Sequence, residues 1–362
     1  MITMKETRLI SLCLGLLLAA SHAEIVTLAH PAQTIPANST VVWSPLFQAA
    51  WDDVNTRFAG PLLRVEPPNE TMDQLDSFKW DPSTTMPLES WKVWSGPATA
   101  EFLRQVNKEA SAILKQPDGE FTLPNQTEPN SLAFFGLLER EVKFFREFFR
   151  SRKSPLKFKL NETEHSVEFF GVKGELSGKF DFVEVLEYKP REGSYLLVMN
   201  CQASDDKVIL YLPAKPDNFA TTCKYIHDLR TMLAQNPQPR EFGKETDNRI
   251  HGGDDIRIPA LKFDTKSDLK SQLSGLRFYQ GEPLPWSINR AEQCTRFELD
   301  SKGARVSARV SGGLDPFGGP IVGVPRKFIF DRPFFVFLWR DEAEWPYFGA
   351  WIGDTSALDA FP

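Results

Sequence analysis

A strict alternation of small apolar and polar residues lies directly before a long glycine- and proline-rich segment near the end of the chain. Residues 304–310 read Ala-Arg-Val-Ser-Ala-Arg-Val, and in a β-strand this order places Arg305, Ser307 and Arg309 on the face opposite the apolar side chains. Residues 311–323 contain five glycines and two prolines, which exclude a strand interior. The chain therefore joins a strand-forming segment to a long loop, and an edge strand beside a surface loop is its simplest interpretation.

The N-terminus has the pattern of an export signal. Lys5 and Arg8 precede an apolar run over residues 9–20, and residues 21–23 form a small-x-small cleavage sequence. This predicts a signal peptide over residues 1–23, cut between Ala23 and Glu24, and a secreted or periplasmic mature chain over 24–362. The apolar run is too short to cross a bilayer, and no later run reaches about eighteen residues, so we expect no membrane span.

The three cysteines beyond the predicted signal leave the disulfide state open. Cys201, Cys223 and Cys294 would lie in an oxidising compartment, where a bridge is permitted. An odd number allows at most one bridge within the chain, and the sequence does not choose among the three possible pairs.

Composition and periodicity predict one large α+β domain. The net charge of −6 without a basic run argues against nucleic-acid binding, and 29 phenylalanines with 9 tryptophans predict a large aromatic core. No linker is long enough to divide the chain. Helices are expected over residues 44–58, 97–114, 219–235 and 266–276, with loop over 60–88. Strands are expected over residues 40–43, 90–95, 156–160, 166–170, 183–188, 194–199, 208–212, 256–263, from 297, 328–339 and 345–352.

Few residues carry the pattern of a catalytic or metal site. The mature chain has no His-Glu-x-x-His or Cys-x-x-Cys motif, no Gly-x-Ser-x-Gly elbow and no phosphate-binding loop, so neither a metal nor a cofactor is predicted. The sequence His-Gly-Gly-Asp-Asp at residues 251–255 is the one candidate for a hydrolase site, with His251 assisting Asp254 or Asp255. A solvated turn explains this passage equally well, and we favour a protein that is not an enzyme.

Several segments together resemble the serpin family of protease inhibitors. Their order along the chain matches the family, and they cover about two thirds of it. They are Asn-Ser-Thr-Val-Val-Trp-Ser-Pro-Leu at 38–46, residues 208–213, residues 256–263 with 268–273, Phe-Glu-Leu-Asp-Ser-Lys-Gly at 297–303, Phe-Asp-Arg-Pro-Phe-Phe-Val-Phe at 330–337 and Trp-Pro-Tyr-Phe-Gly at 345–349. Asn130, Phe134 and Gly136 resemble a central strand of the family, which favours strand over helix for residues 132–149.

The resemblance implies three β-sheets, a helical layer and an exposed reactive loop over about residues 303–327. In inhibitory members a protease cleaves this loop, which then enters the main sheet as an extra strand and traps the acyl-enzyme. The implied partner is an extracellular or periplasmic peptidase, the implied state is a monomer, and no cofactor is needed. The residues that would enter the sheet as the hinge are Gly303, Ala304, Val306, Ala308 and Val310.

Two counts along the loop give different scissile bonds. Counting forward from Gly303 by the family spacing places the bond between Phe317 and Gly318, whereas counting back from Pro333 places it near Val322 and Gly323. We prefer Phe317, because an aromatic side chain fills an apolar specificity pocket.

The sequence also departs from the family. Arg305 and Arg309 interrupt a hinge that usually carries small residues, although the period of two keeps both away from the apolar face. Leu138 replaces a tryptophan, and Gln293 stands where the family has a histidine of the shutter, the region that controls sheet opening. Its other candidate members are Ser44, Pro45 and Asn130. These differences keep a second hypothesis open, in which the fold serves as a non-inhibitory binding or carrier protein.

Overall fold

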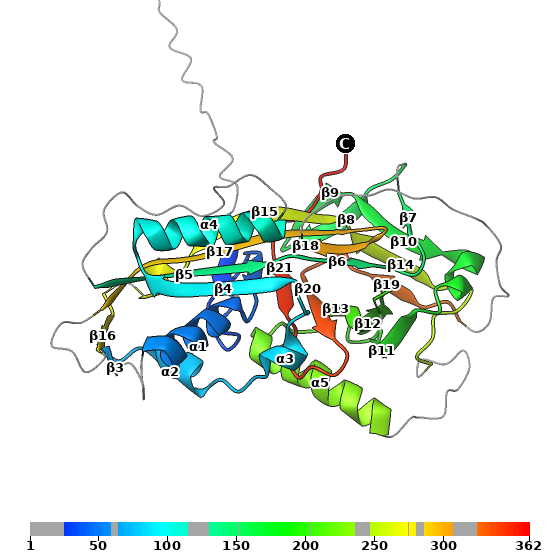
Figure 1. Cartoon of the computed structure of the whole chain (residues 1–362). Coiled ribbons are helices and arrows are strands. Elements are labelled where there is room, and N and C mark those ends of the chain that lie inside the picture. Colours follow the sequence, from blue (N-terminus) through cyan, green and yellow to red (C-terminus); the bar gives the residue numbers. More distant parts are fainter. Residues whose placement is uncertain are drawn as a thin grey trace, which may run out of the picture.

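A mixed β-sheet crosses the centre of the molecule and contains the start of the alternating segment (Figure 1). The computed structural model describes residues 25–58, 64–114, 130–151, 153–203, 205–235, 247–273, 275–279, 286–306 and 324–362. The strands of this central sheet are, in spatial order, β4 (Trp91–Pro97), β5 (Ser131–Leu138), β17 (Ser287–Asp300), β18 (Gly303–Val306) and β6 (Arg140–Lys143). β15 (Leu261–Asp268) pairs with β17 along the opposite edge of that strand.

Helices cover both faces of the central sheet. On one face α1 (Leu46–Phe58) packs against Leu132 and Phe134 of β5. On the other face α4 (Ala100–Leu114) lies along β5 and β17, with Val106 against Phe135 (Figure 1). Alternate residues of β5 therefore face different helices, as the pleat of a strand requires, and every residue of β5 is buried.

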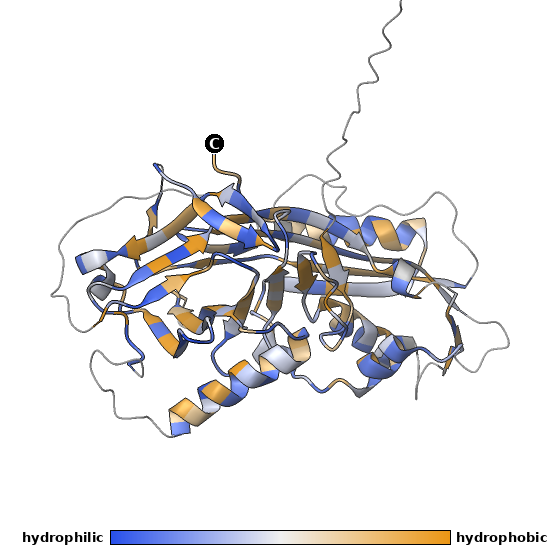
Figure 2. Ribbon diagram, turned by 180° about the vertical axis from the view of Figure 1, so that it is seen from behind, coloured by the Kyte–Doolittle hydropathy of each residue, from blue (hydrophilic) through white to orange (hydrophobic). Residues whose placement is uncertain are grey.

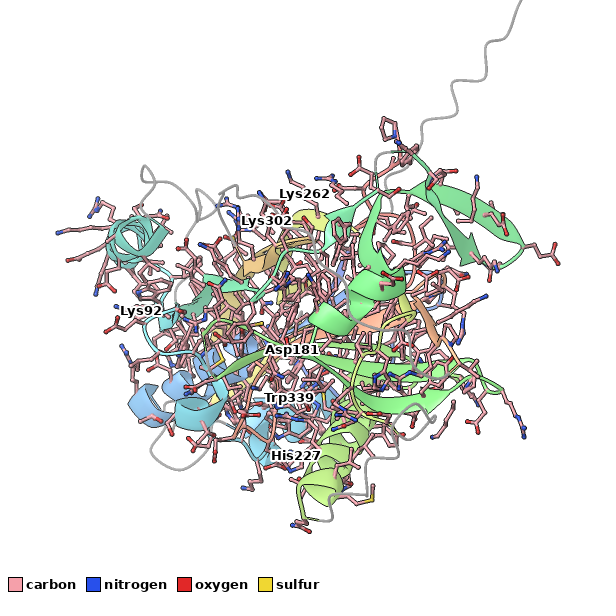
Figure 3. All side chains as sticks on the ribbon, turned by 90° about the vertical axis from the view of Figure 1, so that its right-hand side faces the viewer. Lys92, Asp181, His227, Lys262, Lys302 and Trp339 are labelled. Atoms are coloured by element: carbon pink, nitrogen blue, oxygen red, sulfur yellow. The ribbon has the colours of Figure 1, made fainter. Side chains whose placement is uncertain are left out.

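A second sheet of seven strands lies beside the central one. Its strands, in spatial order, are β1 (Val26–Leu28), β2 (Val41–Trp43), β21 (Phe348–Ile352), β20 (Phe334–Arg340), β13 (Asp206–Leu212), β12 (Ser194–Asn200) and β11 (Val183–Lys189). α5 (Phe219–Gln235) packs Phe219, Cys223 and Ile226 against this sheet, and apolar and polar residues follow one another along the helix (Figure 2). The buried ring of Trp339 in β20 belongs to this contact, near the helix that carries His227 (Figure 3).

The third sheet has four strands, and its edge strand β19 follows the glycine- and proline-rich segment in the sequence. Its order is β19 (Lys327–Ile329), β14 (Asp255–Pro259), β10 (Phe169–Lys173) and β7 (Phe149–Arg150). Two further strand pairs lie in the described ranges, β3 (Arg64–Glu66) with β16 (Arg277–Tyr279) and β8 (Leu156–Leu160) with β9 (Thr163–Val167). The short helices are α2 (Glu70–Ser77), α3 (Pro82–Thr85), α6 (Lys270–Leu273) and a 3-10 turn at Gly174–Lys179.

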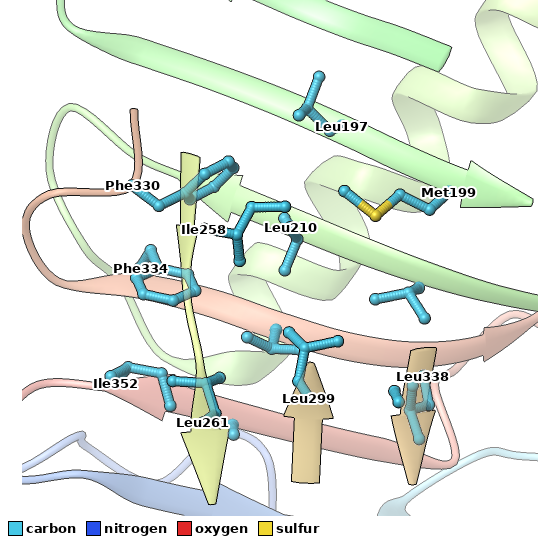
Figure 4. Close-up of a cluster of buried hydrophobic side chains, with 14 of the residues drawn as sticks. Leu197, Met199, Leu210, Ile258, Leu261, Leu299, Phe330, Phe334, Leu338 and Ile352 are labelled. Carbon is cyan, nitrogen blue, oxygen red and sulfur yellow. The ribbon is translucent and has the colours of Figure 1, made fainter. Parts of the chain in front are cut away.

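The three main sheets share one hydrophobic core. Leu299 of β17, Ile258 of β14 and Phe334 of β20 meet in it (Figure 4). Each such side chain contributes about 1.5–3 kcal/mol by leaving water, and the aromatic richness of the sequence is concentrated in this core, as predicted. The expected α+β architecture of three sheets with helices is confirmed.

Two predicted strands are each divided between two sheets. The segment expected as one strand over residues 256–263 splits into β14 and β15, and the segment over 328–339 splits into β19 and β20. Proline lies at both breaks, Pro259 at the end of β14 and Pro333 directly before β20. Proline lacks the N–H that a ladder needs, so the chain changes sheet there.

Residues 60–88 hold more structure than the loop that the sequence predicts. Asn69 caps α2 by accepting a hydrogen bond from Met72 N, and Asp81 caps α3 by accepting one from Ser83 N. Both are ordinary capping residues, so the local signal was present but the helices are too short for periodicity to reveal. The strand expected from residue 297 in fact begins ten positions earlier, at Ser287.

Candidate functional site

The predicted hinge begins as a strand inserted between two others. β18 pairs antiparallel with β17, with Gly303 opposite Asp300 and Arg305 opposite Glu298. On its other edge β18 pairs antiparallel with β6. Further along, where β18 is absent, β17 pairs directly with β5. The wedge that β18 makes between β17 and β6 therefore lies where the central sheet is already parted (Figure 1).

The two faces of β18 differ as the alternation predicts. Ala304 is fully buried in the main core with Leu299 and Val142, its neighbours across the two ladders. Arg305 points to the opposite face, where its Nη2 lies 3.1 Å from Glu141 Oε1. Because directly opposite residues share a face of the sheet, Glu298 lies on the side of Arg305.

Glycine is required at the first position of β18. Gly303 has a φ of +154°, and a Cβ added there would come within 2.0 Å of Val142 O. Real Cβ atoms do not approach a carbonyl this closely, so any other residue would push β18 away from β6. The hinge glycine expected from the sequence thus has a steric cause, the close approach of two backbones.

A cavity of about 250 Å³ lies at the exposed side of the hinge. Its lining includes Glu141, Phe145, Glu298 and Arg305, with Lys302 at the turn between β17 and β18. Lys302 is half-buried there (Figure 3). The parted strands therefore leave a solvent-accessible space beside the first residues of the loop.

An ion pair between half-buried Arg140 and buried Asp206 supports β6. Arg140 donates to Asp206 from Nη2 and, at 3.0 Å, from Nε, and Tyr347 OH donates to the second oxygen of that carboxylate at 3.1 Å. Burial opposes the charge of Arg140, but the hydrogen bond and charge of Asp206 outweigh it and raise the arginine pKa. Burial also raises the pKa of Tyr347 well above its ordinary value. Val306 lies opposite Arg140, so the strand that flanks the hinge is fixed to the seven-stranded sheet.

A second buried network holds the chain where it leaves the loop region. Arg326 donates from its backbone N to Asp254 Oδ1 at 2.8 Å and from Nη2 to Asp254 Oδ2 at 2.8 Å. Its Nη1 donates to Asp247 O at 2.6 Å, and Asp247 Oδ2 lies 2.7 Å from His251 Nε2. All four side chains are buried. They anchor β19 against β14, whose pairing begins one residue later with Lys327 opposite Asp255.

This network gives the hydrolase hypothesis a structural alternative. The Asp254 carboxylate is engaged by Arg326 and by the backbone N of His251, and Asp255 pairs with Arg257 at 2.8 Å. The nearby hydroxyl of Ser177 is fully buried and donates to Asp254 O at 2.5 Å. The residues therefore organise a turn, and none of these bonds presents a nucleophile to His251.

The candidate shutter residues do not form one cluster. Ser44 is buried just before α1, and Leu46 of α1 packs against Gly136, the position directly across the ladder from Gln293. Gln293 is buried, and its Nε2 donates to Thr295 Oγ1 at 3.3 Å. Asn130 instead lies at the far end of this ladder, where its carbonyl accepts a hydrogen bond from Ser287 N at 3.0 Å. Pro45 O accepts a bond from Ala49 N at 2.9 Å in the first turn of α1.

Several predicted residues lie outside the described part of the chain. They are the signal peptide of residues 1–23 and, in the loop, Ala308, Val310, Phe317, Gly318, Val322 and Gly323. The predicted scissile bonds therefore remain predictions.

The three cysteines beyond residue 23 are free and buried. Cys201, Cys223 and Cys294 lie in three different hydrophobic clusters, which separates them from one another. Burial raises the pKa of Cys201 to about 12 and that of Cys223 well above its ordinary value. Their thiols thus contribute to packing rather than to a bridge.

Within the described ranges no three His, Cys, Asp or Glu side chains are grouped so that they could hold a metal ion. None of the helices described there has the length and apolar character needed to span a bilayer.

Sequence reasoning missed the residues that surround the hinge. Glu141, Glu298 and Arg326 have no local signal of their own, because their roles depend on strands far apart in the chain. Asp254 is predicted only as a candidate of the hydrolase site, not as the partner of Arg326. One local signal existed: residues 140–143 read Arg-Glu-Val-Lys, where buried Val142 lies between two charged neighbours. That pattern is typical of a strand with one buried face.

Structural similarity, but not sequence similarity, relates the chain to known proteins. No family model and no curated protein matches the sequence. Human glycosylated kallistatin shares 12% identity over 90% of this chain and 92% of its own, with a TM-score of 0.52. Thyroxine-binding globulin in complex with thyroxine shares 11% identity over 88% of this chain and 93% of its own, with a TM-score of 0.52. Both are serpins, and the similarity confirms the expected serpin architecture. Because the identity is only 11–12%, it shows the fold alone.

Proposed function

We propose that this chain, which has the serpin fold, is a secreted peptidase inhibitor that works by cleavage of its loop and insertion of the cut segment into the central sheet. The observation that carries the proposal is β18, because residues 303–306 already occupy a strand position between β17 and β6. Proteins with this fold include inhibitors as well as non-inhibitory members, so the geometry of the hinge is what favours inhibition here. The signal peptide predicted over residues 1–23 supports a location outside the cytoplasm.

Continued insertion would follow the register that β18 has set. Counting on from the observed pairs, residue 308 would come opposite Thr295 and Leu138, and residue 310 opposite Gln293 and Gly136. The small side chains Ala308 and Val310 would face the core, as Ala304 does. Each added residue would complete two ladders at once, which supplies hydrogen bonds and buried surface to drive the step.

The bait residue is assigned from the sequence. A serine peptidase would attack the carbonyl carbon of Phe317 and release the amine of Gly318, leaving the residues up to 317 esterified to its serine. Insertion of that segment carries the attached peptidase along the sheet before water can hydrolyse the ester. Phe317 suits an apolar specificity pocket, with Val322 as the second candidate. The proposed partner is thus an extracellular or periplasmic peptidase, and the proposed inhibitor is a monomer.

The decisive experiment is incubation with chymotrypsin-like peptidases, followed by denaturing electrophoresis and mass measurement. We expect an adduct stable in SDS and a released fragment that begins at Gly318. The matched variant is Ala304→Glu, which places a carboxylate in the main core at a fully buried position and should allow cleavage while abolishing the adduct. Cleavage of the wild type without an adduct across the whole panel would eliminate inhibition.

A second candidate function, a non-inhibitory binding protein, is favoured by the apolar surface of β17 and β5 beneath α4. In the register of β18, residue 309 would come between Cys294 and Leu137, whose side chains pack under Val106 of α4. Arg309 would there meet an apolar surface, which resists insertion. Measuring the melting temperature before and after loop cleavage decides between the candidates, since a sharp rise requires insertion and no change favours the binding protein.

A further inference from the structure

Arg305 lies between carboxylates of two strands that it holds together. It is directly opposite Glu298 of β17 and directly opposite Glu141 of β6, and opposite residues share a face. The Arg305 Nη2 to Glu141 Oε1 distance is 3.1 Å, and only 12% of the arginine side chain is exposed. All three residues line the same cavity.

The charges around Arg305 favour its position in the sheet. Glu141 Oε1 also lies 3.9 Å from Lys143 Nζ, a weaker contact on its own strand. If β18 left the sheet, Glu141 and Glu298 would face one cavity without the guanidinium between them. Asp300 and Glu147 are on the same lining, so four carboxylates would face two lysines, Lys143 and Lys302. Like charges near one another are unfavourable. Repulsion between the carboxylates therefore favours the state in which Arg305 lies between them.

The same contact selects a single register. A slip of β18 by one residue would turn Arg305 to the face now occupied by Ala304, against Leu299 and Val142 of the core. That would bury a guanidinium among apolar side chains and separate it from Glu141. A slip by two residues would restore the face but put a cation opposite Arg305 in place of one carboxylate, either Lys143 on β6 or Arg296 on β17.

We propose that Arg305 is a positioning residue, whose ion pair with Glu141 opposite Glu298 keeps residues 303–306 in the sheet of the intact chain and fixes the register in which the loop enters. The retention of residues 303–306 stands on the contacts above, and the entry of the loop rests on the proposed function. The arginine that interrupts the expected run of small residues thus holds the hinge in the sheet. We call this ion pair of Arg305 with Glu141 the latch.

The test measures the hinge rather than inhibition. Hydrogen exchange of the amides of residues 303–306 and the rate of loop cleavage by a nonspecific protease are followed at low and high salt. The variants are Arg305→Gln, Arg305→Lys, Glu141→Gln and the double variant Arg305→Gln with Glu141→Gln. The matched control is Arg296→Gln, because Arg296 forms an ion pair with Asp264 of β15 at 3.0 Å, on the opposite edge of β17.

We expect Arg305→Gln to speed exchange of these amides about tenfold, because it removes the largely buried guanidinium from its ion pair with Glu141, and to speed loop cleavage. The exchange and cleavage rates of Arg305→Lys should lie between those of Arg305→Gln and the wild type, because lysine keeps the charge but loses the planar guanidinium. If Arg305→Gln fails to fold, the comparison of Arg305→Lys with the wild type tests the proposal instead. The double variant should equal Arg305→Gln, and the difference from wild type should shrink at high salt.

Unchanged exchange in Arg305→Gln and Arg305→Lys, or an equal change in Arg296→Gln, would overturn the proposal. Its failure is distinguishable from failure of the proposed function. A chain that never forms an adduct but shows Arg305-dependent protection loses only the inhibitory function. A chain that forms adducts while its exchange is independent of Arg305 loses only the latch.

Discussion

Glycine and arginine at the hinge act through contacts with residues more than 150 positions earlier in the chain. Gly303 lets the backbone of β18 approach Val142 O, and Arg305 reaches Glu141 one position before that valine. Alternation alone predicts which face each residue takes. The contacts that make these two residues specific come from β6, which the sequence does not place beside them.

Replacing Gly303 by alanine should open the hinge. The new Cβ would lie 2.0 Å from Val142 O, so β18 must shift away from β6, and we expect a loss of about 1–3 kcal/mol in the free energy of unfolding. Denaturant unfolding gives the loss, and hydrogen exchange at residues 303–306 locates it.

The control is Gly174→Ala. Gly174 also has a positive φ, of +76°, but a Cβ there meets nothing within 4 Å. This variant therefore measures the conformational cost alone. If both alanine variants lose equal stability and leave exchange of β18 unchanged, the clash with Val142 does not matter.

At the scale of the element, α4 decides how far the loop could travel. Its Val106 and Ala110 cover Leu137 and Cys294 of the central sheet, and Glu109 ties the helix to β4 by accepting hydrogen bonds from Lys92 at 2.6 Å and Trp94 at 2.7 Å. These bonds lower the pKa of Glu109 to about 2. An inserted strand would pass beneath this helix, so the helix must tolerate or yield to whatever side chain faces it.

Arg309→Ala should therefore stabilise the cleaved form. In the register of β18 the guanidinium would come between Cys294 and Leu137, at a cost of a few kcal/mol. We expect cleaved Arg309→Ala to melt about 5 °C or more above the cleaved wild type. Ser307→Ala is the matched control, on the same face but without a charge to bury. Equal melting of the cleaved wild type and Arg309→Ala would show that α4 does not obstruct the loop.

At the scale of the whole molecule, buried polar groups fix how the three sheets meet. Arg140 and Asp206 join the central sheet to the seven-stranded one, and Arg326 with Asp254 closes the four-stranded sheet after the loop region. Breaking such a pair leaves an uncompensated buried charge. Global stability consequently depends on protonation as well as on the aromatic core.

Stability should fall in acid in two separate steps. Burial lowers the pKa of His30 to about 4 from 6.5, so the unfolded chain binds the proton more readily and the fold loses about 3 kcal/mol as pH falls from 6.5 to 4. Glu109, with its pKa lowered to about 2, contributes stability that is present above about pH 4.5 and is lost only as pH falls toward 2.

Denaturant unfolding across this range of pH separates the two groups. His30→Gln should remove the step between pH 6.5 and 4 and leave the lower one, whereas Glu109→Gln should do the reverse. His227→Gln, in α5, serves as the control substitution. A step between pH 6.5 and 4 that persists in His30→Gln would refute the assignment.

The sequence by itself determined the residues that must be buried and the face that each would take. Alternation over residues 304–306 and the helical stripe at Val106 and Ala110 are local patterns, and the structure confirms β18 and α4 where they predict them. The family resemblance supplied the expectation of three sheets with a helical layer, which the structure confirms. The two local patterns depend only on neighbours in the chain, which is why the sequence alone reveals them.

Only the tertiary structure decided what lies beside each strand. Two predicted strands divide between sheets at Pro259 and Pro333, because pairing partners, not propensity, set where a strand belongs. The neighbours of Arg305 come from β6 and β17, two strands separated by more than 140 residues. Partnership across such distances depends on register between strands, and no local pattern of side chains encodes it.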